Sequence, residues 1–303
     1  MVVGGSLCSQ NRGWFAAAKM EIVKTIGAIR ELVKSARAQG KRIGFVPTMG
    51  ALHIGHISLI ETAVKECDFV VVSIFVNPTQ FGPGEDFKKY PRPFETDVEI
   101  CKKAGVDVVF APEPAALYPE ENLTWVNVEK LTEPLCGRFR PGHFRGVATV
   151  CAKLFNIVAP DAAYFGQKDG QQALVIKRMV ADLNMPIEIV ICPTVREPNG
   201  LAVSSRNKYL TEQQRKDAAC IYQSLKKCQQ LIEAGITDTG EIITKMREIL
   251  SQPSSIEIQY VSIVDAETLQ NVDKIAGKIL AAVAVKIGRA RLIDNILVDS
   301  GRK

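Results

Sequence analysis

The sequence predicts an α/β protein in which a doubly wound parallel sheet is followed by a second, smaller α+β region. Three observations support this prediction. The order strand, loop, helix repeats from residue 42 to residue 192, which is typical of a sheet with helices on both faces. Its strands, such as the run 69–76, are continuously apolar, as strands buried on both faces are. After Tyr209 two helical patterns follow one another and lead into three β-like segments, an α+β order.

Each predicted element rests on the spacing of its apolar residues and on the glycine or proline at its ends. Helical spacing predicts helices at residues 21–38, 57–64, 94–104, 144–157, 171–184, 212–234 and 239–251. Apolar, β-branched runs predict strands at residues 42–46, 69–76, 106–111, 125–128, 162–165, 187–192, 256–264, 279–285 and 289–297. Ligands bind beyond the carboxyl ends of such parallel strands, so the polar motifs found there are the candidates for function.

Composition limits the class of protein and of partner. The chain has 303 residues, of which 47% are hydrophobic and 23% charged, as in an ordinary soluble domain. A net charge of +5 suits a small anionic substrate but is not the concentrated basic stripe of a nucleic-acid binder. No apolar run approaches the roughly 20 residues that span a membrane. Eight cysteines without a CxxC pair indicate reduced thiols in a cytoplasmic protein.

Residues 1–19 differ from the rest of the chain. They are rich in glycine and alanine, lack periodicity and precede a second methionine, Met20. We interpret them as a disordered extension, a cloning remnant or the product of an upstream start. A short signal peptide is the alternative, but Arg12 and Gly13 interrupt its apolar core.

The segment 47–56 is the most informative motif. It follows a predicted strand, contains Gly50 and Gly55, and places His53 and His56 at the start of a helix. The free N–H groups and the dipole of a helix N-terminus attract anions, and two imidazoles add further donors. The simpler interpretation is that each histidine is a hydrogen-bonded core residue or a helix cap without a role in binding. A zinc site is another alternative, for which the sequence offers no third and fourth ligand nearby.

Four further motifs follow predicted strands or stand near the predicted domain junction. These are residues 77–82 with Gln80, 140–147 with the last histidine, His143, 165–172 with Lys168, and 203–207 with Arg206. An amide at a strand end suits a hydroxy acid, a lysine suits a phosphate, and two hydroxyls with a guanidinium form a phosphate clamp. Each motif alone could equally be a surface turn or a helix start.

Together the five motifs resemble those of the pantothenate synthetase (pantoate–β-alanine ligase) family, and the resemblance covers the chain from Met20 to its C-terminus. The first motif resembles the HIGH signature of a superfamily that includes nucleotidyltransferases and class I aminoacyl-tRNA synthetases. The resemblance implies a Rossmann-like fold and a two-step reaction. The pantoate carboxylate attacks the α-phosphate of ATP, giving pantoyl adenylate and pyrophosphate. The amine of β-alanine then attacks the adenylate, giving pantothenate and AMP.

The resemblance also implies roles for individual residues, with His56 as proton donor and His53, Lys168 and Arg206 as the other catalytic groups. The implied ATP contacts are Met49, Gly50, Ala51, Leu52, His53, Ile54, Gly55, His56, Gly166, Gln167, Lys168, Asp169, Val195, Val203, Ser204, Ser205 and Arg206. Gln80 and Gln172 would hold pantoate, with Gln80 also near β-alanine. Magnesium would accompany ATP, and Asp97 is a candidate to reach the ion.

The expected organisation is a Rossmann-like ATP- and pantoate-binding domain at 20–196 and a C-terminal lid domain at 197–303. The resemblance also implies a homodimer. Two positions depart from the family pattern. Val203 replaces a methionine whose role is apolar and backbone contact, and Gly170 replaces a bulkier residue in a turn. Another nucleotidyltransferase or a synthetase relative is the main alternative, although the chain has no anticodon-binding extension and 204–206 lacks the paired lysines of KMSKS. A non-catalytic nucleotide-binding protein would not need all these polar positions.

Overall fold

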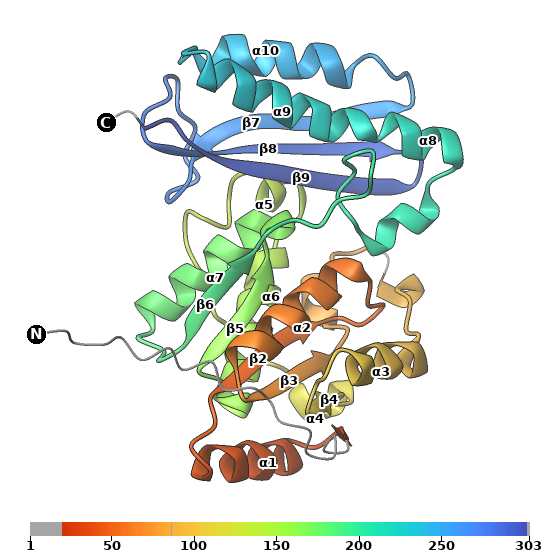
Figure 1. Ribbon diagram of the computed structural model, residues 1–303, viewed down its shortest axis with the longest axis vertical. Coiled ribbons are helices and arrows are strands. Elements are labelled where there is room, and N and C mark those ends of the chain that lie inside the picture. Colours follow the sequence, from red (N-terminus) through yellow and green to blue (C-terminus); the bar gives the residue numbers. More distant parts are fainter. Residues whose placement is uncertain (1–19, 86, 302–303) are drawn as a thin grey trace, which may run out of the picture.

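The structure is a computed structural model that describes residues 20–85 and 87–301, so the predicted extension at 1–19 lies outside the described residues. It contains two sheets (Figure 1). The first has six parallel strands in the order β1-β4-β3-β2-β5-β6, and the second has three antiparallel strands in the order β7-β8-β9. The predicted fold class is therefore confirmed.

The elements alternate along the first part of the chain as predicted. The parallel strands are β1 (Glu21–Val23), β2 (Ile43–Thr48), β3 (Phe69–Ile74), β4 (Val108–Phe110), β5 (Ala162–Gly166) and β6 (Glu188–Cys192). The helices among them are α1 (Ile26–Ala38), α2 (Ile54–Glu66), α3 (Phe94–Lys103), α4 (Pro114–Leu117), α5 (Cys136–Phe139), α6 (His143–Val158) and α7 (Gly170–Asp182). The later elements are α8 (Glu212–Asp217), α9 (Ala219–Glu233), α10 (Thr239–Leu250), β7 (Ile256–Asp265), β8 (Lys278–Ile287) and β9 (Ala290–Asp299).

Helices cover both faces of the parallel sheet. Consecutive residues of β2 show this, because Phe45 packs into the core beneath α1, α6 and α7 while Val46 packs into the core beneath α2 and α3. Both side chains are fully buried, as expected for a central parallel strand. The carboxyl ends of β2, β3, β5 and β6 consequently meet at one edge, from which the next loops start.

Two predicted elements are wrong. The segment 21–23 does not begin a helix but forms the edge strand β1, with Ile22 opposite Val109. The helix begins only at Ile26, because the Thr25 side chain accepts a hydrogen bond from Ala28 and caps it. The segment 125–128 is not a strand, since the Val126 N–H donates to the Thr149 hydroxyl rather than to a neighbouring strand.

The antiparallel sheet lies over the carboxyl ends of the parallel strands, and α9 and α10 cover its outer face (Figure 1). Its third strand, β9, contacts the turn between β5 and α7, a 3-10 turn at Gln167–Asp169 called η3. The predicted boundary at residue 197 and the lid role of the C-terminal part stay predictions. No helix among residues 20–85 and 87–301 is long and apolar enough to cross a bilayer.

The described chain contains seven cysteines, distributed over the hydrophobic cores. All seven are buried and none forms a disulfide: Cys67, Cys101, Cys136, Cys151, Cys192, Cys220 and Cys228. Burial raises the pKa of Cys101, Cys151, Cys220 and Cys228 to about 12. These four thiols are therefore part of the packing, as the scattered spacing predicts. Cys136 differs, because its sulfur lies beside the Tyr260 hydroxyl and the Arg291 guanidinium.

The close packing of α6 against residues 79–80 can be tested at Gly146. A Cβ at Gly146 in α6 would lie 2.4 Å from the Thr79 carbonyl oxygen and 2.8 Å from the Gln80 Cα. Gly146→Ala should therefore lower the free energy of unfolding by about 1–3 kcal/mol through overpacking. Urea unfolding measures this, and Gly27→Ala is the control, because a Cβ on Gly27 in α1 meets nothing within 4 Å. The control should be neutral or stabilising, and equal losses in both variants would contradict this account of the packing.

Candidate active site

The turn between β2 and α2 is held from behind by a carboxylate of another helix. Asp97 in α3 is 1% exposed, and its two oxygens accept the N–H groups of Ala51 and Leu52, both at 2.8 Å. Gly50 and Ala51 have φ values of +77° and +51°. A Cβ on Gly50 would lie 2.9 Å from the Asp97 carboxylate, so the close approach requires glycine. Asp97 thereby fixes the backbone that leads into His53.

The structure shows what Asp97 does for the backbone, and its suggested contact with a magnesium ion stays a prediction. Each of its oxygens accepts one backbone N–H group, and burial raises its pKa. The described residues also contain no group of three or more histidine, cysteine, aspartate or glutamate side chains that could hold a metal ion. The donor set therefore does not form a protein-based metal centre.

His53 and His56 form a reciprocal cap on α2. The Gly55 N–H donates to His53 Nδ1 at 3.2 Å, and the His53 N–H donates to His56 Nδ1 at 3.3 Å. The structure thus confirms the helix-cap reading. A neutral imidazole has one acceptor nitrogen and one N–H, so with Nδ1 accepting in both rings the proton of each lies on Nε2. The cap therefore orders two Nε2–H donors, on rings whose centroids are 4.1 Å apart.

These two histidines are neutral in the ligand-free protein. Burial, and then the charge of Lys168, lowers the pKa of His53 to about 4. Burial, and then the neighbouring ring of His53, lowers the pKa of His56 to about 3. They therefore carry no positive charge near neutral pH. They offer directed N–H donors, while Lys168 and Arg206 supply the charge.

Gln80 is oriented by a buried amide. It ends the 3-10 turn η1 (Pro78–Gln80) after β3, and its Oε1 accepts a hydrogen bond from the Asn77 amide at 3.0 Å. The same Asn77 amide also donates to the Gly146 carbonyl at 3.2 Å, so α6 takes part in fixing it. The Gln80 Nε2 donates to the Met49 sulfur at 3.2 Å. Two residues predicted for different substrates, Met49 and Gln80, thus lie side by side.

Arg140 and His143 form a polar network at a motif to which the sequence alone assigned no role. Arg140 holds the Glu85 carboxylate through two nitrogens, at 2.8 and 2.6 Å, and its Nη1 lies 3.0 Å from His143 Nε2. Because arginine can only donate, His143 Nε2 accepts and its Nδ1–H donates to the Gln80 carbonyl at 2.8 Å. Burial, and then Arg140, lowers the pKa of His143 to about 4. The network fixes the backbone of Gln80.

Two loops close the other side of the site. Lys168 lies in η3, and its ammonium pairs with Asp169 at 3.3 Å. Val203 donates its N–H to the Val195 carbonyl at 3.0 Å, which brings together two residues that the sequence predicted as nucleotide contacts. The Ser204 side chain accepts the Arg206 N–H and so caps the next 3-10 turn, Ser205–Tyr209.

One cavity of about 190 Å³ collects most of the predicted site residues. Those that line it are Met49, His53, Gly55, His56, Gln80, Gly166, Lys168, Asp169, Gln172, Val195, Val203, Ser204, Ser205 and Arg206. Five predicted residues do not line it. Gly50, Ala51 and Leu52 shape the turn behind it, and Ile54 is 58% exposed. The fifth, Gln167, turns instead toward Asn295 of β9.

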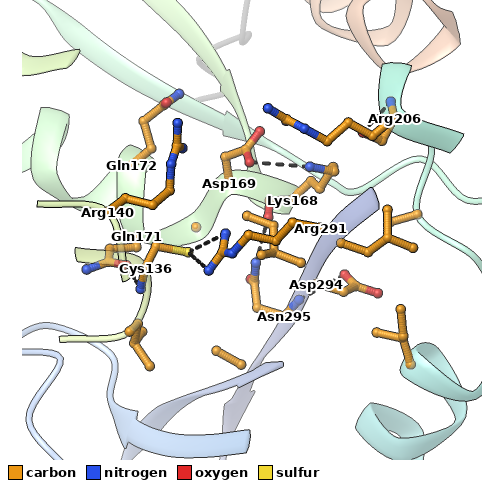
Figure 2. Close-up of a pocket in the computed structure, with 18 of the residues that line it drawn as sticks. Cys136, Arg140, Lys168, Asp169, Gln171, Gln172, Arg206, Arg291, Asp294 and Asn295 are labelled. Carbon is orange, nitrogen blue, oxygen red and sulfur yellow. Dashed lines mark hydrogen bonds and ion pairs between the residues drawn. The ribbon is translucent and has the colours of Figure 1, made fainter. Parts of the chain in front are cut away.

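A second cavity, of about 460 Å³, adjoins the first beneath β9 (Figure 2). Arg140, Lys168 and Arg206 line both cavities. The second cavity also exposes residues that the sequence did not single out, among them Arg291, Asp294 and Asn295 of β9. No local signal could have found them, because they lie more than a hundred positions after Lys168 and carry no motif of their own.

The fold agrees with the comparisons to known proteins. A family model described as pantoate-beta-alanine ligase matches residues 21–297. The chain belongs to this family. As a member of the pantoate–β-alanine ligase family it is an enzyme of the ligase class. A pantothenate synthetase from Moorella thermoacetica is 55% identical over 280 residues, covering 92% of this chain and 99% of the relative.

Solved structures of the ligase family match along nearly the whole chain. The pantothenate synthetase from Thermus thermophilus superposes with a TM-score of 0.87 at 45% identity, covering 91% of this chain and 99% of that one. The pantoate–β-alanine ligase from Francisella tularensis, in complex with beta-gamma ATP and beta-alanine, gives a TM-score of 0.75 at 39% identity. That match covers 92% of this chain and 97% of the other.

The lowered histidine pKa values predict acid sensitivity. An unfolded histidine titrates near pH 6.5, whereas the folded protein takes up these protons only near pH 4 or below. Between those values the unfolded chain binds more protons, so the free energy of unfolding should fall as the pH drops from 7 to 5. Urea titrations without nucleotide measure this. His53→Asn keeps a capping side chain but removes one titrating group, and should reduce the slope. A slope of zero in the unmodified protein would contradict the buried, neutral histidines.

Proposed function

We propose that the chain condenses pantoate with β-alanine in two steps, through a pantoyl adenylate, and releases pyrophosphate and AMP. The observation that carries this proposal is the convergence of N–H donors, cations and two glutamines in one cavity at the strand ends. Activating a carboxylate with ATP brings two anions into contact. A site with several fixed donors can offset their repulsion and hold the reacting atoms in line.

ATP is proposed to lie with its phosphates at the N-terminus of α2. His53, His56, Lys168 and Arg206, which can donate through Nε2–H, ammonium and guanidinium groups, all line this cavity. The helix dipole adds partial positive charge at the same place. The Francisella tularensis ligase in complex with beta-gamma ATP and beta-alanine supports both molecules as substrates here.

In the first proposed step Gln80 and Gln172 orient pantoate, and its carboxylate oxygen forms a bond to the α-phosphorus. The bond from that phosphorus to the bridging oxygen breaks, and pyrophosphate leaves with the electron pair. Negative charge on the phosphate oxygens is stabilised by His53, His56, Lys168 and Arg206, which are donors in place before the reaction. His56 is proposed to donate its Nε2 proton in a hydrogen bond to this charge.

In the second proposed step the neutral amine of β-alanine attacks the acyl carbon. The new C–N bond forms, the C–O bond to the phosphate breaks, AMP leaves, and the amine proton passes to solvent. No covalent enzyme intermediate is needed, which agrees with seven described cysteines that are all buried. Any magnesium is proposed to arrive on the ATP phosphates, because the described residues form no metal cluster. A homodimer and a cytoplasmic location remain predictions.

The partial reactions test the function. Protein, ATP, magnesium and pantoate should release pyrophosphate without β-alanine, and no pyrophosphate should form if pantoate is left out. Adding β-alanine should produce AMP and pantothenate in equal amounts. Pyrophosphate can be followed by a coupled assay and the products by mass spectrometry. The proposal would be refuted if folded protein released no pyrophosphate in response to pantoate, or if it charged tRNA instead.

The role of His56 is tested with two substitutions that separate its two nitrogens. His56→Asn keeps an acceptor near the Nδ1 position for the His53 N–H but removes the distal donor. Adenylate formation should slow about 10²- to 10³-fold, the usual effect of losing one such donor. His56→Gln places an amide N–H near the Nε2 position and should retain more activity. Equal rates in His56→Asn and the unmodified protein would remove His56 from the mechanism.

A further inference from the structure

One side chain of the C-terminal sheet reaches into the turn that carries Lys168. Asn295, on β9, donates through its Nδ2 to the carbonyls of Gln167 and Lys168, at 3.0 and 2.9 Å. Its Oδ1 accepts a hydrogen bond from Gln167 Nε2 at 2.6 Å. Both donors and the acceptor of the Asn295 amide are thus engaged, and the residue is 6% exposed. Figure 2 shows Asn295 near Lys168 in the lining of the larger cavity.

The turn fits closely against this amide. A Cβ built on Gly170 would lie 2.9 Å from Asn295 Oδ1 and 3.1 Å from Gln167 Nε2. This close contact explains why glycine stands at position 170, where the sequence departs from the family pattern. Gly170 allows the first turn of α7 to approach β9 without a gap.

The backbone of Asn295 is held by its neighbour Asp294, which forms an ion pair with Arg196 in the loop that starts at Val195. Asp294 is 3% exposed, pairs with the two terminal guanidinium nitrogens of Arg196, and accepts the Asn295 N–H at 2.8 Å. Arg196 also donates to the Gly200 carbonyl at 3.1 Å and stacks on the Tyr222 ring at 3.9 Å. Strand β9 thus contacts both loops that border the cavity, the one with Lys168 and the one that starts at Val195.

We propose that Asn295 is a positioning residue for the adenylation step, acting through Lys168. Lysine is a flexible point charge, and its backbone position decides where its ammonium can reach. Asn295 fixes the two carbonyls that bracket the Lys168 backbone, and so directs its side chain toward the cavity. The proposal rests on the proposed function, because it assigns Lys168 to the transferred phosphate. It gives the C-terminal sheet a part in the chemistry although Asn295 contacts no substrate.

The test uses Asn295→Asp, which keeps the shape and the acceptor but loses both donations. Single-turnover pyrophosphate release at saturating ATP should slow about 10- to 100-fold, the effect of a misplacement of about 1 Å. The KM for pantoate should change less than threefold, because Gln80 is oriented by Asn77 and not by this contact. Asn295→Ala, which removes the acceptor as well, should slow the step at least as much.

A double-mutant cycle separates positioning from a general loss of structure. In a Lys168→Ala background the effect of Asn295→Asp should shrink to less than about threefold, since the group through which it acts is gone. The same 10- to 100-fold loss in both backgrounds would overturn the proposal, and so would an unchanged rate in Asn295→Asp. An unmodified protein without pantoate-dependent pyrophosphate release would instead refute the proposed function.

A matched control is available far from the site. Thr239, 5% exposed in α10, also bonds two backbone carbonyls with one side chain, those of Val272 and Asp273, at 2.6 and 3.1 Å. Thr239→Val should lower the melting temperature without changing the single-turnover rate measured below it. A loss of rate in Thr239→Val equal to that in Asn295→Asp would show that any weakening of the C-terminal part slows the step, and would overturn the specific role of Asn295.

Discussion

The carboxylate of Asp97 holds the turn on which the rest of the site depends. Burying a carboxylate is unfavourable unless its oxygens are hydrogen-bonded, and here two backbone N–H groups satisfy them. Those same bonds keep Ala51 in a left-handed conformation that a residue with a Cβ rarely adopts. The start of α2 follows directly from this turn. The reciprocal histidine cap, and hence the direction of both Nε2–H donors, therefore depends on α3, a helix that contributes none of the proposed catalytic groups.

Positive and negative charges in the site nearly balance. Arg140 is matched by Glu85 and Lys168 by Asp169, while His53, His56 and His143 are neutral. A site of this kind can hold donors close together without strong mutual repulsion before any anion is bound. Dipoles and N–H groups that are already oriented stabilise developing charge without rearrangement, which is the most effective form of electrostatic catalysis. In this site the geometry of the donors therefore contributes more than the net charge.

Apolar runs and the glycines that follow them predict where the strands end. They give no information on contacts between residues far apart in the chain. The apolar run before Thr48 and the glycine after it predicted the turn, and Gln80, Lys168 and Gln172 followed strands that do meet at one edge. The short strand at 21–23 was mistaken for a helix, since three residues give no usable period. The contact of Asp97 with the backbone of Ala51 and Leu52 carries no signal in the sequence, because a carboxylate looks the same there whether it faces an ion or a backbone N–H. Asn295 and Gln167 are 128 residues apart, and no pattern in one chain links them.

The buried cysteines allow local unfolding of the protein to be measured by thiol labelling. Only the thiolate reacts with alkylating reagents. Burial suppresses the reaction in two ways, because it raises the pKa of the thiol and blocks access of the reagent. Cys67 and Cys101 lie in the core under α2, Cys151 in the core on the opposite face of the sheet, and Cys220 and Cys228 between α9 and the antiparallel sheet. The labelling rate at each position therefore measures the free energy of exposing that layer. The three layers can be followed separately in the unmodified chain, without introducing a probe.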